Sequence, residues 1–525
     1  MTRVCERFLR LIQNGAAIFA ALFICATTVW ADPVMISADG GFELSGDVLG
    51  FDGTYLRLET EHGEVTVDFA RVTCAGADCP DPDGLPVLRL SGSTRIAEIL
   101  LPALIEGFAR NERLLIQRHE IDASHFAYDL TDSDTDIAAK FLFRSTTTNE
   151  GFADLLAHEA DIVMAIREIR DQEADLAREV GLGTLGSARQ ARILAMDGIV
   201  PITSLSQPVT SIDPEDLARV FTGEITRWSE LGGVDLPIKL HLPDAQNGLA
   251  QGFEDLVFRS TGAEMTTDIQ RHNSVQTLVD AVSRDVRALG IAHSKAFGSS
   301  SPMALVGECG RQSTPSRVTL MTGDYPLTQP LFLYLPARRL PPMATRFLAW
   351  LRSADAQLII RRAGFVDQGH MTIPIDAQGA RFAAAIETAG PDIPLTELQR
   401  MVRLLGPRER VATTFRFEVG STRLTALSRS NVQLLAKAIR DGEYEDQELI
   451  FVGFSDGRGP AAANRDLSSA RADAVRREVI AALGDHIPLN VELGTDAFGE
   501  AMPMGCDTSE WGRQMNRRVE LWVEP

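Results

Sequence analysis

The chain has 525 residues, 45% of them hydrophobic, which is enough for two or more domains with complete cores. Its formal net charge of −21 argues against nucleic acid or an anionic membrane surface as a partner. No Cys-X-X-Cys or Cys/His spacing indicates a zinc or redox site, so no metal and no cofactor is expected.

Residues 1–31 have the features of a secretory signal peptide. Arg3, Arg7 and Arg10 form its charged start, and residues 16–29 form an uncharged, mostly apolar core. The small residues at the end of this segment predict cleavage after Ala31. A retained membrane anchor is the alternative, but the apolar run is short for a membrane span. We therefore expect an exported, periplasmic protein.

Four cysteines remain after cleavage, an even number that suggests disulfides in an oxidising compartment. Cys74 and Cys79 are close enough to close a small loop, and we predict that they pair. Cys309 and Cys506 would staple two domains together, but the sequence alone does not establish this pairing.

Residues 32–83 are predicted to form a small all-β module. Three short strands alternate with turns, which suggests a small β-barrel or a three-stranded cap: Phe42–Val48, Tyr55–Glu59 and Glu64–Val72. No function can be assigned to this module from its residues.

Residues 84–372 alternate strands with helices, the pattern of a mostly parallel α/β sheet. Three units share one order: an apolar strand, a polar or Gly-bearing turn, and a helix. The turns hold these candidate anion-binding residues: Ser91, Gly92, Ser93 and Thr94; Ser145 and Thr146; Asn247 and Gly248. The N-terminus of a helix presents unpaired N–H groups to an anion. One such turn is usually an ordinary helix cap, whereas three in one domain favour a binding cleft.

The sequence of this region resembles the PstS-like phosphate-binding family of periplasmic substrate-binding proteins. The matching stretches include SGSTRIAEILLPALIEGFA, ADIVMAIREI, PITSLSQPVTSIDPEDLARVFTGEITRWSELGG and LVDAVSRDVRALGIA. The resemblance implies a two-lobed type 2 fold with crossover strands, hinge closure around a small anion such as phosphate, and a transporter or envelope protein as partner.

The ligand is less well specified than the fold. Arg167 stands where the family places an anion-pairing residue, but the family's acceptor Asp is absent. The third turn reads Gln246-Asn247-Gly248 instead of Ser-Gly-Thr. Phosphate, another anion and an eroded pocket all remain open, and Arg167 in the charged run REIRDQE is equally compatible with a surface position.

Residues 373–410 are predicted to form linker helices, Ala380–Ala389 and Leu395–Leu405, ahead of a last domain at 411–525. The last domain has a β-α-β-α-β-β order, which fits a two-layer α+β fold. Its predicted elements are Thr413–Val419, Thr425–Arg440, Leu449–Phe454, Leu467–Leu483, Asn490–Leu493 and Arg518–Val523.

Asp456 and Arg471 are the leading candidates for function in this domain. Asp456 ends an apolar strand in the turn SDGRG, and Arg471 interrupts an apolar helix stripe in NRDLSSARADAV. With the late strand Asn516–Glu520, these motifs resemble the OmpA-like peptidoglycan-binding domain. That resemblance implies that Asp456 binds the ammonium of diaminopimelate in the stem peptide and that Arg471 pairs with its carboxylate. Asn464 and Arg517 are weaker candidates.

Two alternatives accompany this interpretation. Asp456 and Arg471 would satisfy each other if they formed an internal salt bridge. The run Gly453-Phe454-Ser455-Asp456-Gly457 also fits the nucleophile elbow of an exported hydrolase, but a helix should begin directly after that Ser. Here a Gly- and Pro-containing loop follows, with the helix expected near Asp466.

We therefore predict a non-enzymatic, exported envelope protein, cell-wall associated and close to the outer membrane. It would bind peptidoglycan through its last domain and a small anion through its two-lobed cleft. The alternative is a structural envelope scaffold whose binding domain has lost its ligand.

Overall fold

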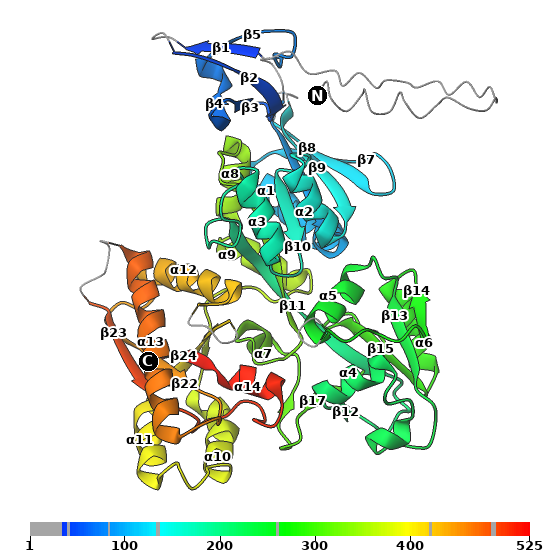
Figure 1. Cartoon of the computed structure of the whole chain (residues 1–525), viewed down its shortest axis with the longest axis vertical. Coiled ribbons are helices and arrows are strands. Elements are labelled where there is room, and N and C mark those ends of the chain that lie inside the picture. Colours follow the sequence, from blue (N-terminus) through cyan, green and yellow to red (C-terminus); the bar gives the residue numbers. More distant parts are fainter. Residues whose placement is uncertain are drawn as a thin grey trace, which may run out of the picture.

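The computed structural model describes residues 34–38, 42–81, 85–132, 137–258, 262–418, 423–484 and 490–524. The predicted signal segment and its cleavage position lie outside these residues. Along the longest axis, a small sheet at one end is followed by a first α/β lobe, and a second lobe and the C-terminal domain then lie side by side (Figure 1).

The N-terminal module is a five-stranded antiparallel sheet in the order β4-β3-β2-β1-β5. Its strands are β1 (Val34–Ala38), β2 (Phe42–Phe51), β3 (Tyr55–Thr60), β4 (Gly63–Asp68) and β5 (Thr73–Ala75). The sequence predicted β2, β3 and β4 and missed β1 and β5, which are short and lie together at the other side of the sheet. A disulfide joins Cys74 to Cys79.

The two-lobed part is built on one mixed sheet in the order β14-β13-β15-β11-β19-β10-β6-β9-β8-β7. The first lobe holds β6 (Val87–Ser93), β7 (Leu115–Glu120), β8 (His125–Thr131), β9 (Ile137–Thr146) and β10 (Ile162–Ala165). The second lobe holds β13 (Lys239–Pro243), β14 (Ile269–His272) and β15 (Ala288–His293). The long strands β11 (Ala191–Thr203) and β19 (Thr328–Tyr334) run between the lobes. This is the predicted two-lobed fold with crossover strands.

Helices cover both lobes (Figure 1). The first lobe carries a π-helical turn, Ile96–Leu100, then α1 (Leu101–Glu112), α2 (Thr148–Leu156), α3 (Asp171–Glu179), α8 (Pro342–Trp350) and α9 (Ala354–Arg362). The second lobe carries α4 (Pro214–Thr222), α5 (Gly248–Val257) and α6 (Val275–Arg284). A small sheet of β12 (Ser211–Ile212), β17 (Ala304–Val306) and β18 (Gln312–Ser313) lies beside α4, and α7 (Arg317–Met321) precedes β19.

The C-terminal sheet has the order β20-β21-β24-β22-β23. Its strands are β20 (Thr372–Ile373), β21 (Glu409–Arg416), β22 (Glu448–Phe454), β23 (Glu492–Ala497) and β24 (Arg518–Val523). Leu449 and Phe451 of β22 face a core shared with α12 (Ala426–Arg440) and α13 (Ala461–Leu483). Ile450 and Val452 face the opposite core, so both faces of this strand are buried, as its unbroken apolar run indicates.

Two expectations for this region need correction. The predicted linker helices, α10 (Gly379–Glu387) and α11 (Leu395–Leu405), do not span a gap but pack on the second face of the C-terminal sheet, next to Trp522. Helix α13 begins at Ala461, directly after Pro460, and not near Asp466, because the three alanines at 461–463 are strong helix formers. The short helix α14 (Glu510–Asn516) was not predicted.

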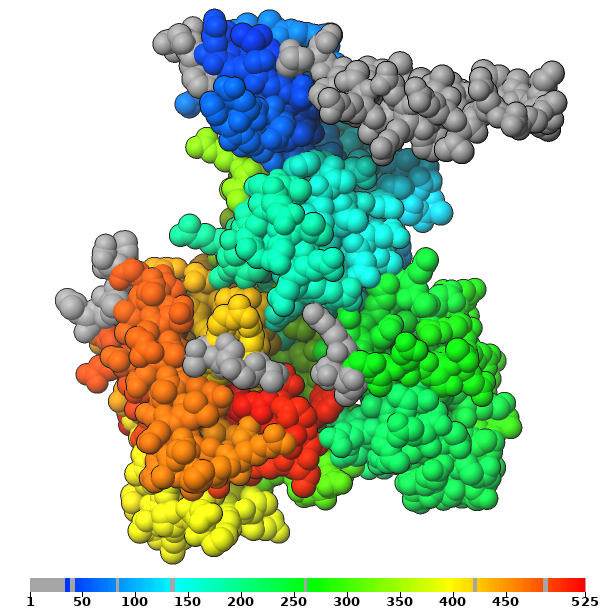
Figure 2. Space-filling model, in the orientation of Figure 1, coloured from blue at the N-terminus to red at the C-terminus, as the bar shows by residue number. Residues whose placement is uncertain are grey.

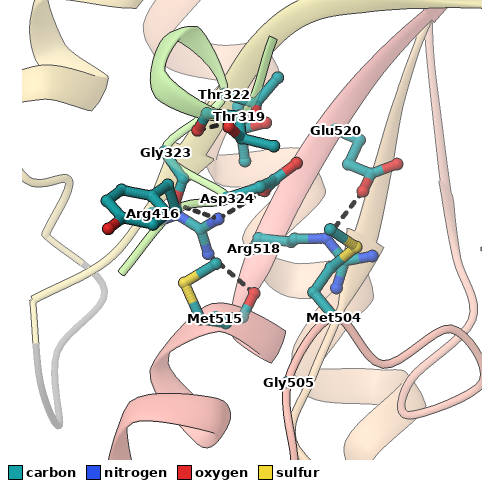
Figure 3. Close-up of polar contacts among 12 residues, drawn as sticks. Thr319, Thr322, Gly323, Asp324, Arg416, Met504, Gly505, Met515, Arg518 and Glu520 are labelled. Carbon is teal, nitrogen blue, oxygen red and sulfur yellow. Dashed lines mark hydrogen bonds and ion pairs between the residues drawn. The ribbon is translucent and has the colours of Figure 1, made fainter. Parts of the chain in front are cut away.

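The C-terminal domain is fixed to the second lobe by a disulfide and by buried ion pairs. Cys309, which follows β17, is bonded to Cys506. Asp324, just before β19, pairs with Arg410 at 2.9 Å. It also pairs with Arg416 at 2.8 Å (Figure 3). The space-filling view shows α14 and its neighbours in contact with the second lobe (Figure 2).

Behind these pairs lies Glu520 of β24, which is fully buried. Its carboxylate accepts hydrogen bonds from Arg381 and from Arg518, the latter at 2.7 Å. Four guanidinium groups thus surround two carboxylates. We call this set the interdomain ion cluster: Asp324, Arg381, Arg410, Arg416, Arg518 and Glu520.

Within the part of the chain that the structure describes, no helix is long and apolar enough to cross a membrane.

Candidate functional sites

Arg471 is the central residue of the C-terminal candidate site. Its side chain on α13 is only 8% exposed, and its Nε and Nη1 atoms are buried without a hydrogen-bond partner in the part of the chain that the structure describes. The guanidinium lies 5.3 Å from the centroid of the Phe417 ring. Burial, and then the charge of Arg517, lowers the pKa of Arg471. A buried cation with free donors is unfavourable unless an acceptor meets it, so this geometry suits an anionic ligand.

Asp456 lies in the loop after β22 and pairs with a different arginine. Its Oδ2 accepts a hydrogen bond from Arg517 Nη1 at 2.8 Å, and its Oδ1 accepts one from the Arg458 N–H at 3.2 Å. Arg517 also donates to Glu510 at 2.8 Å. Among the described residues no carboxylate lies within ion-pair distance of Arg471, so the internal Asp456–Arg471 salt bridge does not form.

Asn464 and Ser455 lie in the same region of the C-terminal domain and differ in whether the protein supplies a hydrogen-bond partner. Asn464 Nδ2 donates to Glu500 at 2.5 Å. The Ser455 hydroxyl is buried without a partner. Residues 455–460 form a loop between β22 and α13, so no helix begins after Ser455 as a nucleophile elbow requires.

In the first lobe, two of the predicted anion-binding turns are hydrogen-bonded to their surroundings. Ser91 Oγ donates to Asp154 at 2.5 Å, and Thr94 Oγ1 donates to the Thr146 carbonyl at 3.2 Å. Ser145 Oγ donates to Glu98 at 2.8 Å, and Thr146 Oγ1 donates to Glu150. The parallel pairing of β6 with β9 brings these two turns together, as predicted for neighbouring strand ends.

Ser93 differs from its neighbours because its hydroxyl has no partner. It is 1% exposed, and a Cβ built on Gly248 at the start of α5 would lie 3.3 Å from its Oγ atom. Asn247 caps α5 by accepting from the Leu249 N–H at 2.9 Å. One turn further along α5, Gly252 contacts the amide of Gln329, which is also buried without a partner. One unsatisfied polar group, Ser93, therefore faces the N-terminal turn of α5, where a helix favours anions, and a second, Gln329, faces the following turn.

Arg167 is not free in this structure. Its guanidinium donates to Glu173 at 2.6 Å and to Asn149 at 2.6 Å, and it lies 3.5 Å from Asp255 of the second lobe. Arg170 also pairs with Asp255, at 3.0 Å. These ion pairs connect the two lobes. Because Arg167 is engaged in them, the N-terminal turn of α5 faces neutral donors such as the Ser93 hydroxyl and not a free cation.

A second set of residues between the lobes was not predicted. Arg95 pairs with Asp197 of β11 at 3.1 Å, and His293 of β15 lies 3.0 Å from the same carboxylate. Burial acts to raise the pKa of Asp197, but the charges of His293 and Arg95 outweigh it and hold the pKa at about 2. Asp197 is a single carboxylate inside the apolar run of β11. Because a buried charge needs a partner, this residue could have indicated a buried ion pair from the sequence.

No group of three or more His, Cys, Asp or Glu side chains among the described residues is placed to hold a metal ion.

Comparison with known proteins identifies two families in the chain. The model of the PBP superfamily domain matches residues 84–355, more than half of the chain, and the model of the OmpA family matches residues 416–517. Protein SphX of Synechococcus elongatus is 25% identical over 230 residues, which cover 42% of this chain and 66% of that protein. The phosphate-binding protein PstS of Staphylococcus haemolyticus is 22% identical over 200 residues, 37% of this chain and 60% of that protein.

The match thus spans just under two thirds of the length of these two relatives. Among solved structures, an ABC-type phosphate transport receptor from Vibrio cholerae aligns with a TM-score of 0.42 and 20% identity, covering 53% of this chain and 99% of the receptor. The chain belongs to the PBP superfamily, with a PstS-like domain followed by an OmpA family domain.

Proposed function

We propose that this chain is an exported envelope protein that is held to peptidoglycan through its C-terminal domain and captures a small anion between its two lobes. The signal segment 1–31, the β module 32–83, the binding domain 84–372, the helices 373–410 and the anchor 411–525 would form its parts. The observation that carries the anchoring function is the buried Arg471 guanidinium with two free nitrogen atoms.

In this proposal, Arg471 receives a carboxylate of the stem peptide. A carboxylate suits a guanidinium because two parallel N–H···O bonds can form, and burial strengthens them. Asp456 would bind the ammonium of diaminopimelate. A second carboxylate, Glu510, is close by, since both acidic residues pair with Arg517. Asp456 and Glu510 would thus bind the ammonium, and Arg471 would bind the carboxylate, of the same zwitterionic residue.

Cosedimentation of the full chain with insoluble peptidoglycan tests the anchor. We expect retention to fall at least tenfold in Arg471→Ala and in Asp456→Ala, because each loses a charged hydrogen bond to the ligand. Arg477→Ala is the matched control, since Arg477 is an exposed arginine on the same helix. Free diaminopimelate should displace the wild-type protein, and cadaverine, which lacks the carboxylates, should not. Unchanged retention in both site variants would refute this anchor.

The second function, anion capture, is supported by the unsatisfied Ser93 hydroxyl that faces the start of α5. The proposed donors are the turns Ser91–Thr94, Ser145–Thr146 and Asn247–Gly248. Arg167 would act mainly by joining the lobes, because Glu173 already neutralises it. Two relatives named phosphate-binding protein or phosphate transport receptor make phosphate the first ligand to test.

Calorimetric titration of the full chain with phosphate, sulfate and other small oxyanions tests this function. We expect micromolar binding that weakens about tenfold in Ser93→Ala. Ser229→Ala, an exposed serine of the second lobe, should bind like the wild type. If none of these anions binds to the folded protein, the structural scaffold is the better description.

A further inference from the structure

A cavity of about 340 Å³ separates the first lobe from the C-terminal domain. Strands β11 and β19 and helices α8 and α9 form one wall, and α12 forms the other. The cavity is distinct from the cleft between the lobes, because none of the residues predicted for the cleft lines it. Its volume lies at the small end of the range of ligand pockets in proteins.

The polar groups that remain unsatisfied in this cavity are all donors. Arg192 Nε and Gln368 Nε2 are buried without a hydrogen-bond partner. Among the described residues, no carboxylate pairs with Arg192 or with Arg352, which is exposed at the edge of the same cavity. Burial, and then the charge of Arg352, lowers the pKa of Arg192. Water satisfies a free amide, but it does not neutralise two neighbouring cations.

The remaining charges of the lining do not compensate these two arginines. Arg361 pairs with Asp367 at 2.6 Å, and Lys437 pairs with Asp441. Glu443 is an exposed carboxylate of the lining, and no ion pair joins it to Arg192 or Arg352 in the described part of the chain. The cavity therefore keeps a net positive charge next to two unpaired donors.

The rest of the lining is apolar. Leu333 and Leu348 contribute from the first lobe, and Leu427 and Leu434 contribute from α12. An occupant that matches both parts needs an anionic head for the arginines and an apolar body for the leucines.

We propose that this cavity is a second ligand site, which binds a small amphipathic carboxylate. The head of the ligand contacts Arg192, Arg352 and Gln368, and its hydrocarbon body packs between β19 and α12. Because one wall belongs to the first lobe and the crossover strands and the other to the C-terminal domain, this ligand lies between these two parts of the molecule. The inference does not depend on which anion occupies the cleft.

Calorimetry of the full chain with octanoate is the first test. Octanoate should bind, whereas octylamine, with the same body and the opposite charge, should not. Phosphate alone should not compete with octanoate, which separates this site from the cleft. Equal binding of octanoate and octylamine, or no binding of octanoate, would overturn the proposal.

Two variants locate the site. Arg192→Gln should weaken octanoate binding at least tenfold and leave the melting temperature unchanged or higher, because it removes a half-buried cation that pairs with no carboxylate among the described residues. Leu434→Trp should block binding by filling the cavity from α12. Ser93→Ala should bind octanoate like the wild type. If both cavity variants bind octanoate normally, the ligand binds elsewhere and the proposal is wrong.

Discussion

Arg167 and Arg471 are both buried, but only Arg167 forms ion pairs with carboxylates among the described residues. Glu173 and Asp255 surround Arg167, so its burial is compensated inside the protein. Among the described residues, Arg471 contacts the face of the Phe417 ring and keeps two nitrogen atoms without a hydrogen-bond partner. The sequence predicted both residues as candidates for binding an anion. Only the packing around them separates an arginine that is paired inside the protein from one that keeps unpaired nitrogen atoms.

Removal of Arg167 should therefore destabilise the protein. Arg167→Ala leaves Glu173 and Asp255 without their partner in a poorly solvated place, and we expect the free energy of unfolding to fall by about 3 kcal/mol. Arg178→Ala is the control, because Arg178 and Asp175 are 58% and 60% exposed and their pair contributes less than about 1 kcal/mol. Urea unfolding measures both. Equal losses would show that the buried pair does not hold the lobes.

His241 of β13 gives the protein a specific pH dependence. It is 3% exposed, its Nδ1 atom lies 2.9 Å from Nε2 of His272, and burial followed by the charge of His272 lowers its pKa to about 4. An unfolded His titrates near 6.5, so the folded protein favours the neutral form. This stability is complete above pH 6.5 and is lost as the pH falls toward 4, by about 3 kcal/mol in total.

The variant His241→Gln isolates this contribution. Its free energy of unfolding should fall less steeply between pH 6.5 and pH 4 than that of the wild type, since the buried titrating group is gone. Parallel curves for the two proteins would contradict the assignment to His241.

At the scale of elements, the C-terminal site depends on the close approach of α13 to β22. A Cβ built on Gly453 would lie 2.0 Å from the Ser468 carbonyl oxygen of the helix, a distance that neither backbone can accept. Glycine at this position lets the strand and the helix approach so closely. This approach sets the positions of Asp456 after the strand and of Arg471 on the helix relative to each other.

Gly453→Ala should separate the two elements and lower the free energy of unfolding by about 3 kcal/mol. It should also reduce peptidoglycan retention, because Asp456 and Arg471 move apart. Gly494→Ala in the adjacent strand β23 is the control, since the nearest atom to its added Cβ lies 3.5 Å away. If Gly453→Ala melts like this control, the close approach is not required.

The elements themselves were largely predictable from local patterns. Apolar runs and turns located α11 and β24 at their observed bounds, and the three turns near Ser93, Ser145 and Asn247 were placed correctly at strand ends. The partners of buried charges were not predictable. In the sequence, Glu520 is a single charged residue in an otherwise mostly apolar strand. Its hydrogen-bond partner Arg381 lies far away in the sequence. Only tertiary packing brings such groups together, and the same holds for the cavity at Arg192.

At the scale of the whole molecule, the Cys309–Cys506 disulfide joins residues 197 positions apart. A cross-link over a loop of this length limits the unfolded chain strongly, and the chain-entropy model gives about 5 kcal/mol. We expect Cys309→Ser/Cys506→Ser to lower the free energy of unfolding by up to this amount. Cys74→Ser/Cys79→Ser, with a separation of 5, should lose only about 2 kcal/mol. Urea unfolding measures the loss in the free energy of unfolding of both double variants. A smaller loss for the Cys309–Cys506 variant than for the Cys74–Cys79 variant would contradict the chain-entropy model.

The same disulfide attaches the C-terminal domain at a second point. The main chain connects this domain to the end of α9 in the first lobe, and the Cys309–Cys506 bond connects it to the second lobe. Together with β19, these connections form a closed covalent ring that passes through both lobes. A force applied to the C-terminal domain is therefore shared between the two lobes instead of being transmitted through the crossover strands alone, and the covalent ring limits how far the lobes can move apart.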